Sequence, residues 1–203
     1  MRRRPRYCRR RAIRRSDLAL LLLLAAIIFP FLHRSTPKIS LPDKMAELAL
    51  SQVGKVTYFW GGKSERMGPD PRWGMLTRVT SEGSDTTGTL LPYGLDCSGL
   101  ISWAAVNAAG TTSAYDVIGE GVRAQYANCT TVPWKDARPG DLCFFPDLSH
   151  VGIVVGKHTD GTLRVVHSSK TYGGVVLSED AALIGFTSVG RPNLYKRFTS
   201  ISG

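Results

Sequence analysis

Cysteine and histidine are the residue types in this chain best suited to nucleophilic chemistry, and the sequence contains four of each. Cys97 draws attention first, because it follows Asp96 and opens an apolar run that is typical of a helix. A thiol at a helix N-terminus faces the positive end of the helix dipole and free backbone N–H groups, which lower its pKa. The same N–H groups could hold the oxyanion that forms when a thiolate attacks a carbonyl. The position therefore favours a nucleophile, with a buried structural thiol as the alternative.

A cysteine nucleophile needs a base, normally a histidine that a third polar group orients. His150 begins one predicted strand and His167 ends the next, whereas His158 lies in the loop between them and reads as a solvated residue. A tight turn at Asp160-Gly161 would place His167 opposite Val154, about 13 Å from His150. The two rings can then meet only if the connection is longer or a strand contains a bulge. We expect His150 to be the base and His167 its orienting partner.

The net charge of +10 is concentrated at one end of the chain. Nine arginines fall within residues 1–15, whereas from Leu41 onward fifteen basic residues balance fifteen acidic ones. A nucleic-acid-binding domain would carry its charge as a patch on the folded part, so we expect no nucleic-acid partner. The alternative, a basic nucleic-acid or nuclear signal, stays open for any arginine-rich stretch.

An apolar stretch without charges follows the basic tail at residues 18–32. It would span roughly 22 Å as a helix, less than the about 30 Å of a hydrocarbon core, although flanking arginines can extend it. No A-x-A-like cleavage site follows it, which favours an uncleaved signal anchor over a signal peptide. We expect a cytoplasmic tail at 1–17, a transmembrane signal anchor at 18–34, a linker at 35–42 and a folded domain at 43–203 outside the cell membrane. A cleaved signal peptide would instead give a secreted protein.

The cysteine count agrees with a free thiol in the exported part. Cys8 lies in the basic tail, so three cysteines remain, an odd number. No two of them have the CxxC spacing of a metal or redox pair, and we expect neither a metal nor another cofactor. Cys143 reads as a buried free thiol, and its pairing with Cys129 is the lesser alternative.

The hydrophobic pattern predicts helices early and antiparallel strands late, which is typical of an α+β domain. Asp43 and Gly54 are expected to bound the first helix, and Gly110 to end the second. The expected helices are 43–53, 97–109 and, more weakly, 116–128. The expected strands are 141–145, 150–155 and 163–167, with one or two more at 175–177 and 184–189.

Residues 63–95 show little periodicity and directly precede the candidate nucleophile. A loop of this length without structure is unusual in a compact domain and is often functional. We interpret it as an insertion at the rim of the site, and a tolerated surface excursion is equally compatible with the composition.

Five blocks, TYFWGG, LDCSGLISW, RPGDLCFF, SHVGIVVG and VVHSS, occur in the order in which the NlpC-type family of bacterial cell-wall cysteine endopeptidases has them. The resemblance extends from about residue 45 to 189. It implies a papain-like α+β fold with helices packed on an antiparallel sheet. It also implies hydrolysis of an amide in the peptidoglycan stem peptide, commonly the γ-D-glutamyl bond to the diamino acid. The family pattern has only a few residues where this chain has 63–95, which puts substrate choice in doubt.

The resemblance assigns roles to individual positions. Cys97 would be the nucleophile, His150 the general base and His167 the orienting residue. Tyr58 would line the site, and Asp96 and Ser98 would contact the substrate peptide, although capping of the helix explains Ser98 equally well. Two other functions stay open: a cysteine acyltransferase or amidase, and a non-catalytic wall-binding or assembly module of a secretion or DNA-transfer apparatus. The sequence predicts no oligomeric state.

Overall fold

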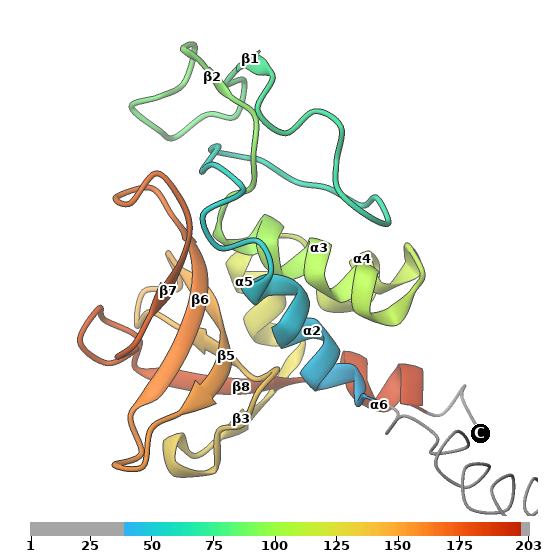
Figure 1. The fold of residues 1–203 in the computed structure, drawn as a ribbon, viewed down its shortest axis with the longest axis vertical. Helices are drawn as coiled ribbons and strands as arrows, with labels where there is room; N and C mark the ends of the chain where they lie inside the picture. Colours follow the sequence, from blue (N-terminus) through green and yellow to red (C-terminus); the bar gives the residue numbers. More distant parts are fainter. Residues whose placement is uncertain (1–38, 200–203) are drawn as a thin grey trace, which may run out of the picture. The chain divides into compact units, whose positions relative to one another are not determined.

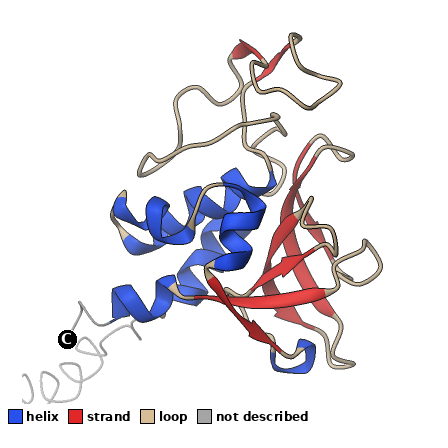
Figure 2. Ribbon diagram, turned by 180° about the vertical axis from the view of Figure 1, so that it is seen from behind, coloured by secondary structure: helices blue, strands red, loops and turns tan. Residues whose placement is uncertain are grey.

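The computed structural model describes residues 39–199, in which one antiparallel sheet is covered on one face by a layer of helices (Figures 1 and 2). The six-stranded sheet has the order β3-β8-β4-β5-β6-β7. The predicted α+β class is therefore confirmed. The helices are α2 (Leu41–Leu50), α3 (Cys97–Ala109), α4 (Ser113–Ile118), α5 (Gly121–Ala127) and α6 (Leu194–Thr199). The strands are β1 (Leu76–Arg78), β2 (Leu90–Pro92), β3 (Cys129–Val132), β4 (Leu142–Phe144), β5 (Val151–Lys157), β6 (Leu163–Ser169), β7 (Gly174–Ser178) and β8 (Ser188–Pro192).

The expected tail and signal anchor at 1–34 lie outside the described residues. Among residues 39–199, no helix has the length and apolar character that crossing a membrane requires. The expected linker at 35–42 ends too late, because α2 already begins at Leu41. Ser40, and not Asp43, caps this helix: its hydroxyl oxygen accepts from the Asp43 backbone N–H. Proline in the first turn is compatible with this start, since its missing N–H would have had no helical partner.

Helix α3 has the bounds predicted for it and forms the centre of the domain. Gly110 ends it in the left-handed conformation (φ 69°), which glycine adopts without strain. Most of its residues are buried, because α2 and α4 pack beside it and β5 and β6 pass beneath it. The candidate nucleophile thus lies at the N-terminus of the most enclosed helix of the domain.

The predictions were wrong at the ends of the sheet and in the second helical region. The single helix expected at 116–128 is two short helices, because Gly119 has a positive φ (91°) that breaks the helical path between them. Strands were expected at 184–189, but β8 begins only at Ser188. Strand β3 and helix α6 were not expected, since neither shows a clear periodic pattern.

Strands β5 and β6 pair in a register that differs from the tight-turn expectation. Val154 lies opposite Val165 instead of His167, and the register shifts between Val154 and Gly156. The connection is also longer, closed by a hydrogen bond from the His158 N–H to the Thr162 carbonyl. Both effects move His167 toward the start of β5, which is the bulged geometry that contact with His150 requires.

Residues 63–95 form a compact excursion at one end of the domain (Figure 1). Strands β1 and β2 pair antiparallel within it. Val79 and Tyr93 of the insertion form a small apolar cluster with Phe59, which precedes it. The residues that flank the insertion meet at the N-terminus of α3, where the Asp96 N–H donates to the Gly62 carbonyl. The two ends of the insertion are therefore held together, and its apolar side chains pack on the chain that precedes it.

The contact between Gly62 and α3 gives a test of this packing. A Cβ atom at Gly99 would lie 2.0 Å from the Gly62 carbonyl oxygen. We expect Gly99→Ala to lower the free energy of unfolding by about 1–3 kcal/mol, although alanine is the better helix former. Thermal denaturation measures this loss. Gly156→Ala is the control, because its new Cβ would have no atom closer than 3.6 Å. Equal stability of the two variants would contradict the tight contact.

Candidate active site

Cys97 occupies the first turn of α3 and is 7% exposed. The backbone N–H groups of Ser98 and Val151 lie close enough to the thiol to act against the rise in its pKa. Because Val151 directly follows His150, this places the sulfur beside the start of β5. The predicted nucleophile Cys97 and the predicted base His150 line the same cavity.

Burial dominates the protonation of Cys97. Burial and, to a smaller extent, the nearby Asp96 carboxylate raise the pKa of the thiol, and Lys63 and the backbone N–H groups of Val151 and Ser98 lower it, so that it lies at about 11. The helix N-terminus alone would lower the pKa, which was the expectation from the sequence. That expectation was wrong in sign, because desolvation of the thiolate outweighs the helix dipole and its N–H groups.

The two histidines contact each other directly. His150 Nε2 lies 2.8 Å from His167 Nδ1, and His167 Nε2 lies 2.9 Å from the Ser178 hydroxyl. A ring nitrogen that bonds a fixed partner sets the tautomer and orientation of the imidazole. The two hydrogen bonds therefore connect His150 through His167 to Ser178, which is the last residue of β7 in the sheet.

Aromatic rings enclose the histidine pair. Phe186 stacks on His150 with 5.6 Å between ring centroids, and Phe145 meets the same imidazole edge-on at 5.0 Å. This burial lowers the pKa of His150 to about 4, and burial together with His150 lowers the pKa of His167 to about 4. At neutral pH the site therefore holds a neutral thiol and two neutral imidazoles. A neutral imidazole is the form in which His150 could act as a general base and accept the proton of the Cys97 thiol.

An open cavity of about 550 Å³ adjoins these groups. Tyr58 lines it, and burial, followed by the charges of Cys97 and Asp96, raises the pKa of this phenol well above its usual value. Tyr58 is therefore a neutral hydroxyl at the wall of the cavity. Other residues lining the cavity are Cys97, Phe145, Ser149, His150, His167, Ser169, Lys170, Thr171, Tyr172, Leu183 and Ile184.

Asp96 and Ser98 lie on either side of Cys97 and have structural roles. Asp96 Oδ1 accepts from the Gly99 N–H at 2.7 Å and from the Ser98 hydroxyl at 3.0 Å, so that it caps α3. Lys63, which the sequence did not single out, binds this carboxylate through its ammonium. Ser178 was missed as well. Strand alternation could have indicated Ser178, but nothing in the sequence shows that Lys63 reaches Asp96.

The remaining singled-out residues lie elsewhere. His158 is exposed and bonds Glu179 at 3.0 Å, as a loop residue would. Cys129 and Cys143 are free thiols within the described residues, and Cys143 is buried. Burial raises the pKa of Cys129 to about 12, so that little of this thiol is ionised at neutral pH.

A thiol at a helix N-terminus and an oriented imidazole, both beside an open cavity, form the arrangement that covalent thiol chemistry uses. The NlpC/P60 family model matches residues 54–183, and the chain belongs to this family. The protein named "Probable endopeptidase Rv2190c" of Mycobacterium tuberculosis is 33% identical over 130 residues, which cover 64% of this chain. The match takes up only 23% of that relative's length.

Solved structures share the fold. The P60 domain of an M. avium subspecies paratuberculosis antigen superposes with a TM-score of 0.53 at 23% identity, covering 74% of this chain and 93% of that one. The peptidoglycan hydrolase RipB of M. tuberculosis gives 0.51 at 23% identity, covering 88% and 85%. RipD of M. tuberculosis, a non-catalytic NlpC/p60 domain protein, gives 0.53 at 24% identity, covering 76% and 98%.

The raised pKa of Cys97 predicts slow thiol chemistry in the free protein. We expect iodoacetamide to alkylate Cys97 more slowly at pH 8 than it alkylates a cysteine in an unstructured peptide, because less thiolate is present. The rate should keep rising above pH 9. Mass spectrometry of the modified peptide measures it, and a Cys97→Ser variant gives the background from the other thiols. An inflection below pH 8 would contradict the dominance of burial.

The two buried histidines predict an acid-sensitive fold. Their pKa values are about 4 in the folded protein and about 6.5 when unfolded. As the pH falls from 6.5 to 4, the unfolded chain therefore binds protons that the folded protein does not bind. The free energy of unfolding falls as a result. We expect the Tm to drop across this window, and to drop less in a His150→Gln, His167→Gln double variant. His158→Gln is the control and should keep the full slope. An unchanged slope in the double variant would contradict the assignment.

Proposed function

We propose that this protein is a peptidoglycan endopeptidase that cleaves an amide of the stem peptide by covalent cysteine catalysis. The contact between His150 and His167, beside the helix N-terminus that holds Cys97, carries the proposal. The NlpC/P60 family and the relative named an endopeptidase support the hydrolase class. RipB, a peptidoglycan hydrolase with this fold, supports the choice of substrate.

The proposed reaction has two steps. His150 accepts the thiol proton as the Cys97 sulfur attacks the amide carbonyl, and N–H groups at the start of α3 stabilise the oxyanion. Collapse breaks the C–N bond, and protonated His150 gives its proton to the leaving amine. Water, deprotonated by His150, then attacks the thioester and releases the acid and the thiol. His167 acts by holding the His150 ring, and Tyr58 offers a hydroxyl beside the carbonyl.

The bond that we propose is the γ-D-glutamyl amide to the diamino acid, with Asp96 and Ser98 at the edge of the substrate groove. The activity would take place outside the cell membrane, with the N-terminal segment as a single-pass anchor. Such an anchor would confine cleavage to the wall nearest the membrane, which suits local remodelling. If the segment is cleaved instead, the domain would be secreted.

A wall-binding role is the second candidate, and two observations favour it. RipD shares the fold and is described as adapted to peptidoglycan binding without catalysis. The neutral resting state of Cys97 also lowers the amount of thiolate available. The complete pairing of His150, His167 and Ser178 speaks for catalysis, since a binding role gives no reason to orient an imidazole beside a thiol.

Peptidoglycan digestion decides between these roles. We expect Cys97→Ala to lose at least about a thousandfold in rate on purified peptidoglycan, and His150→Ala to lose a similar factor, because the nucleophile and its base act as a unit. His158→Ala is the matched histidine control and should digest as the parent does. Mass analysis of the released muropeptides identifies the bond that is cut and would reveal the new amide or ester of a transferase. Parent protein that binds peptidoglycan without releasing fragments would establish the binding role instead.

A further inference from the structure

Lys63 places an ammonium group directly beside the nucleophile. Its Nζ lies 2.5 Å from both carboxylate oxygens of Asp96 and 2.7 Å from the Ser98 hydroxyl. Asp96 is 6% exposed and Ser98 is 3% exposed. The two residues on either side of Cys97 thus form an anionic position, and this position already holds a cation that the protein itself supplies.

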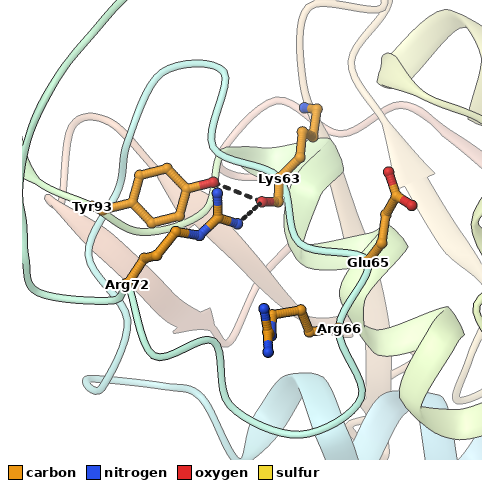
Figure 3. Close-up of a pocket in the computed structure, with 5 residues that line it drawn as sticks. All are labelled: Lys63, Glu65, Arg66, Arg72 and Tyr93. Carbon is orange, nitrogen blue, oxygen red and sulfur yellow. Dashed lines mark hydrogen bonds between the residues drawn. The ribbon is translucent and has the colours of Figure 1, made fainter.

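The insertion fixes the backbone from which this lysine extends. The Lys63 carbonyl accepts a hydrogen bond from the Tyr93 hydroxyl at 2.7 Å and another from the Arg72 guanidinium at 3.3 Å (Figure 3). Figure 3 also shows the Lys63 side chain leaving in the direction away from these donors. The Lys63 carbonyl is therefore held on one side of the backbone, while the Lys63 ammonium reaches the start of α3 on the other side.

Arg72 is itself held firmly. Its guanidinium donates to the Asp70 carboxylate, which is 2% exposed, at 2.6 Å, and lies 4.5 Å from the centre of the Tyr93 ring. A buried carboxylate that fixes a guanidinium through two nitrogens is a rigid pairing. A series of contacts therefore links the ordered part of the insertion to the residue that precedes Cys97. It runs from Asp70 through Arg72 and Lys63 to Asp96.

A nearly buried carboxylate at this place needs a positive partner, because burying an unpaired charge is costly. A substrate peptide could supply that partner through a free amino group. Lys63 supplies it within the molecule, without the entropy cost of binding a second molecule. A substrate ammonium would have to displace Lys63 and leave a second cation nearby.

We propose that Lys63 is a specificity-determining residue that closes the Asp96–Ser98 position to substrate ammonium groups. The groove then accepts peptides whose amino terminus is already acylated, such as stem peptides still joined to the glycan. This inference rests on the proposed function for its substrate class. Removing the Lys63 charge should open the position and create a preference for a free amine that the parent protein lacks.

The test uses two peptides of the same stem sequence, one with a free amino terminus and one acetylated, and the full chain carrying Cys97→Ala so that nothing is cleaved. Calorimetry gives the ratio of their Kd values. The parent background should bind the acetylated peptide at least as tightly as the free one. With Lys63→Met added, the free peptide should bind about tenfold more tightly than the acetylated one, since a charge-assisted hydrogen bond becomes available to it. Lys63→Met with Asp96→Asn should lose this preference again, and Lys55→Met, at an exposed lysine, should leave the ratio at the parent value.

The outcomes separate the two proposals. A parent protein that already prefers the free amine tenfold, or an unchanged ratio in Lys63→Met, overturns the role of Lys63. If Lys63→Met does not fold by circular dichroism, Arg72→Met should shift the ratio in the same direction by a smaller factor, and no shift there overturns the role as well. Cleavage of the same peptides by chains with Cys97 intact tests the proposed function by itself. Peptides that bind with the expected ratios but stay uncut would support the role of Lys63 and refute the endopeptidase.

Discussion

The carboxylate of Asp96 is the group on which the rest of the site depends. It caps α3 through the Gly99 N–H, orients the Ser98 hydroxyl and holds the Lys63 ammonium, all next to Cys97. Its charge also affects the protonation of the groups that we propose as catalytic, because it raises the pKa of Cys97 and opposes the fall in the pKa of His150. One side chain therefore sets where the helix begins and how the reacting groups are charged. Replacing it would change the architecture and the electrostatics together.

The burial that builds this site also sets its resting chemistry. Aromatic rings around His150 and the enclosed start of α3 exclude water, and desolvation favours the neutral forms of the thiol and both imidazoles. A neutral thiol and imidazole are less reactive than a thiolate–imidazolium ion pair. Proton transfer from the thiol to the imidazole can still accompany attack of the sulfur on a bound carbonyl. The arrangement is therefore consistent with a thiol that stays unreactive until another molecule fills the cavity.

The parts of the fold that periodic patterns specify were predictable from the sequence. Helix α3 has the expected bounds because an apolar run begins at a capping residue and ends at Gly110. Both histidines could be identified by their positions at neighbouring strand ends, but their contact could not, since a register shift near Gly156 and a longer connection decide it. The sign of the Cys97 pKa shift was wrong for a related reason: a helix start is visible in a sequence, whereas the burial of that start depends on the whole tertiary structure.

The insertion packs against residues that neighbour Cys97 and its cavity. It meets the domain at the base of α3 through Lys63 and also at the β6–β7 connection, where Asp85 pairs with Lys170. Lys170 lines the same cavity as Cys97, so the insertion contacts one residue of the cavity wall through Asp85. A flexible excursion would contribute little there, but this segment has its own pair of strands and packs Val79 and Tyr93 against Phe59. The groups that we propose as catalytic belong to the helix and the sheet. The ammonium that we propose as a specificity determinant, that of Lys63, comes from the insertion. Under these proposals, substrate choice can change in the insertion without change to the chemistry.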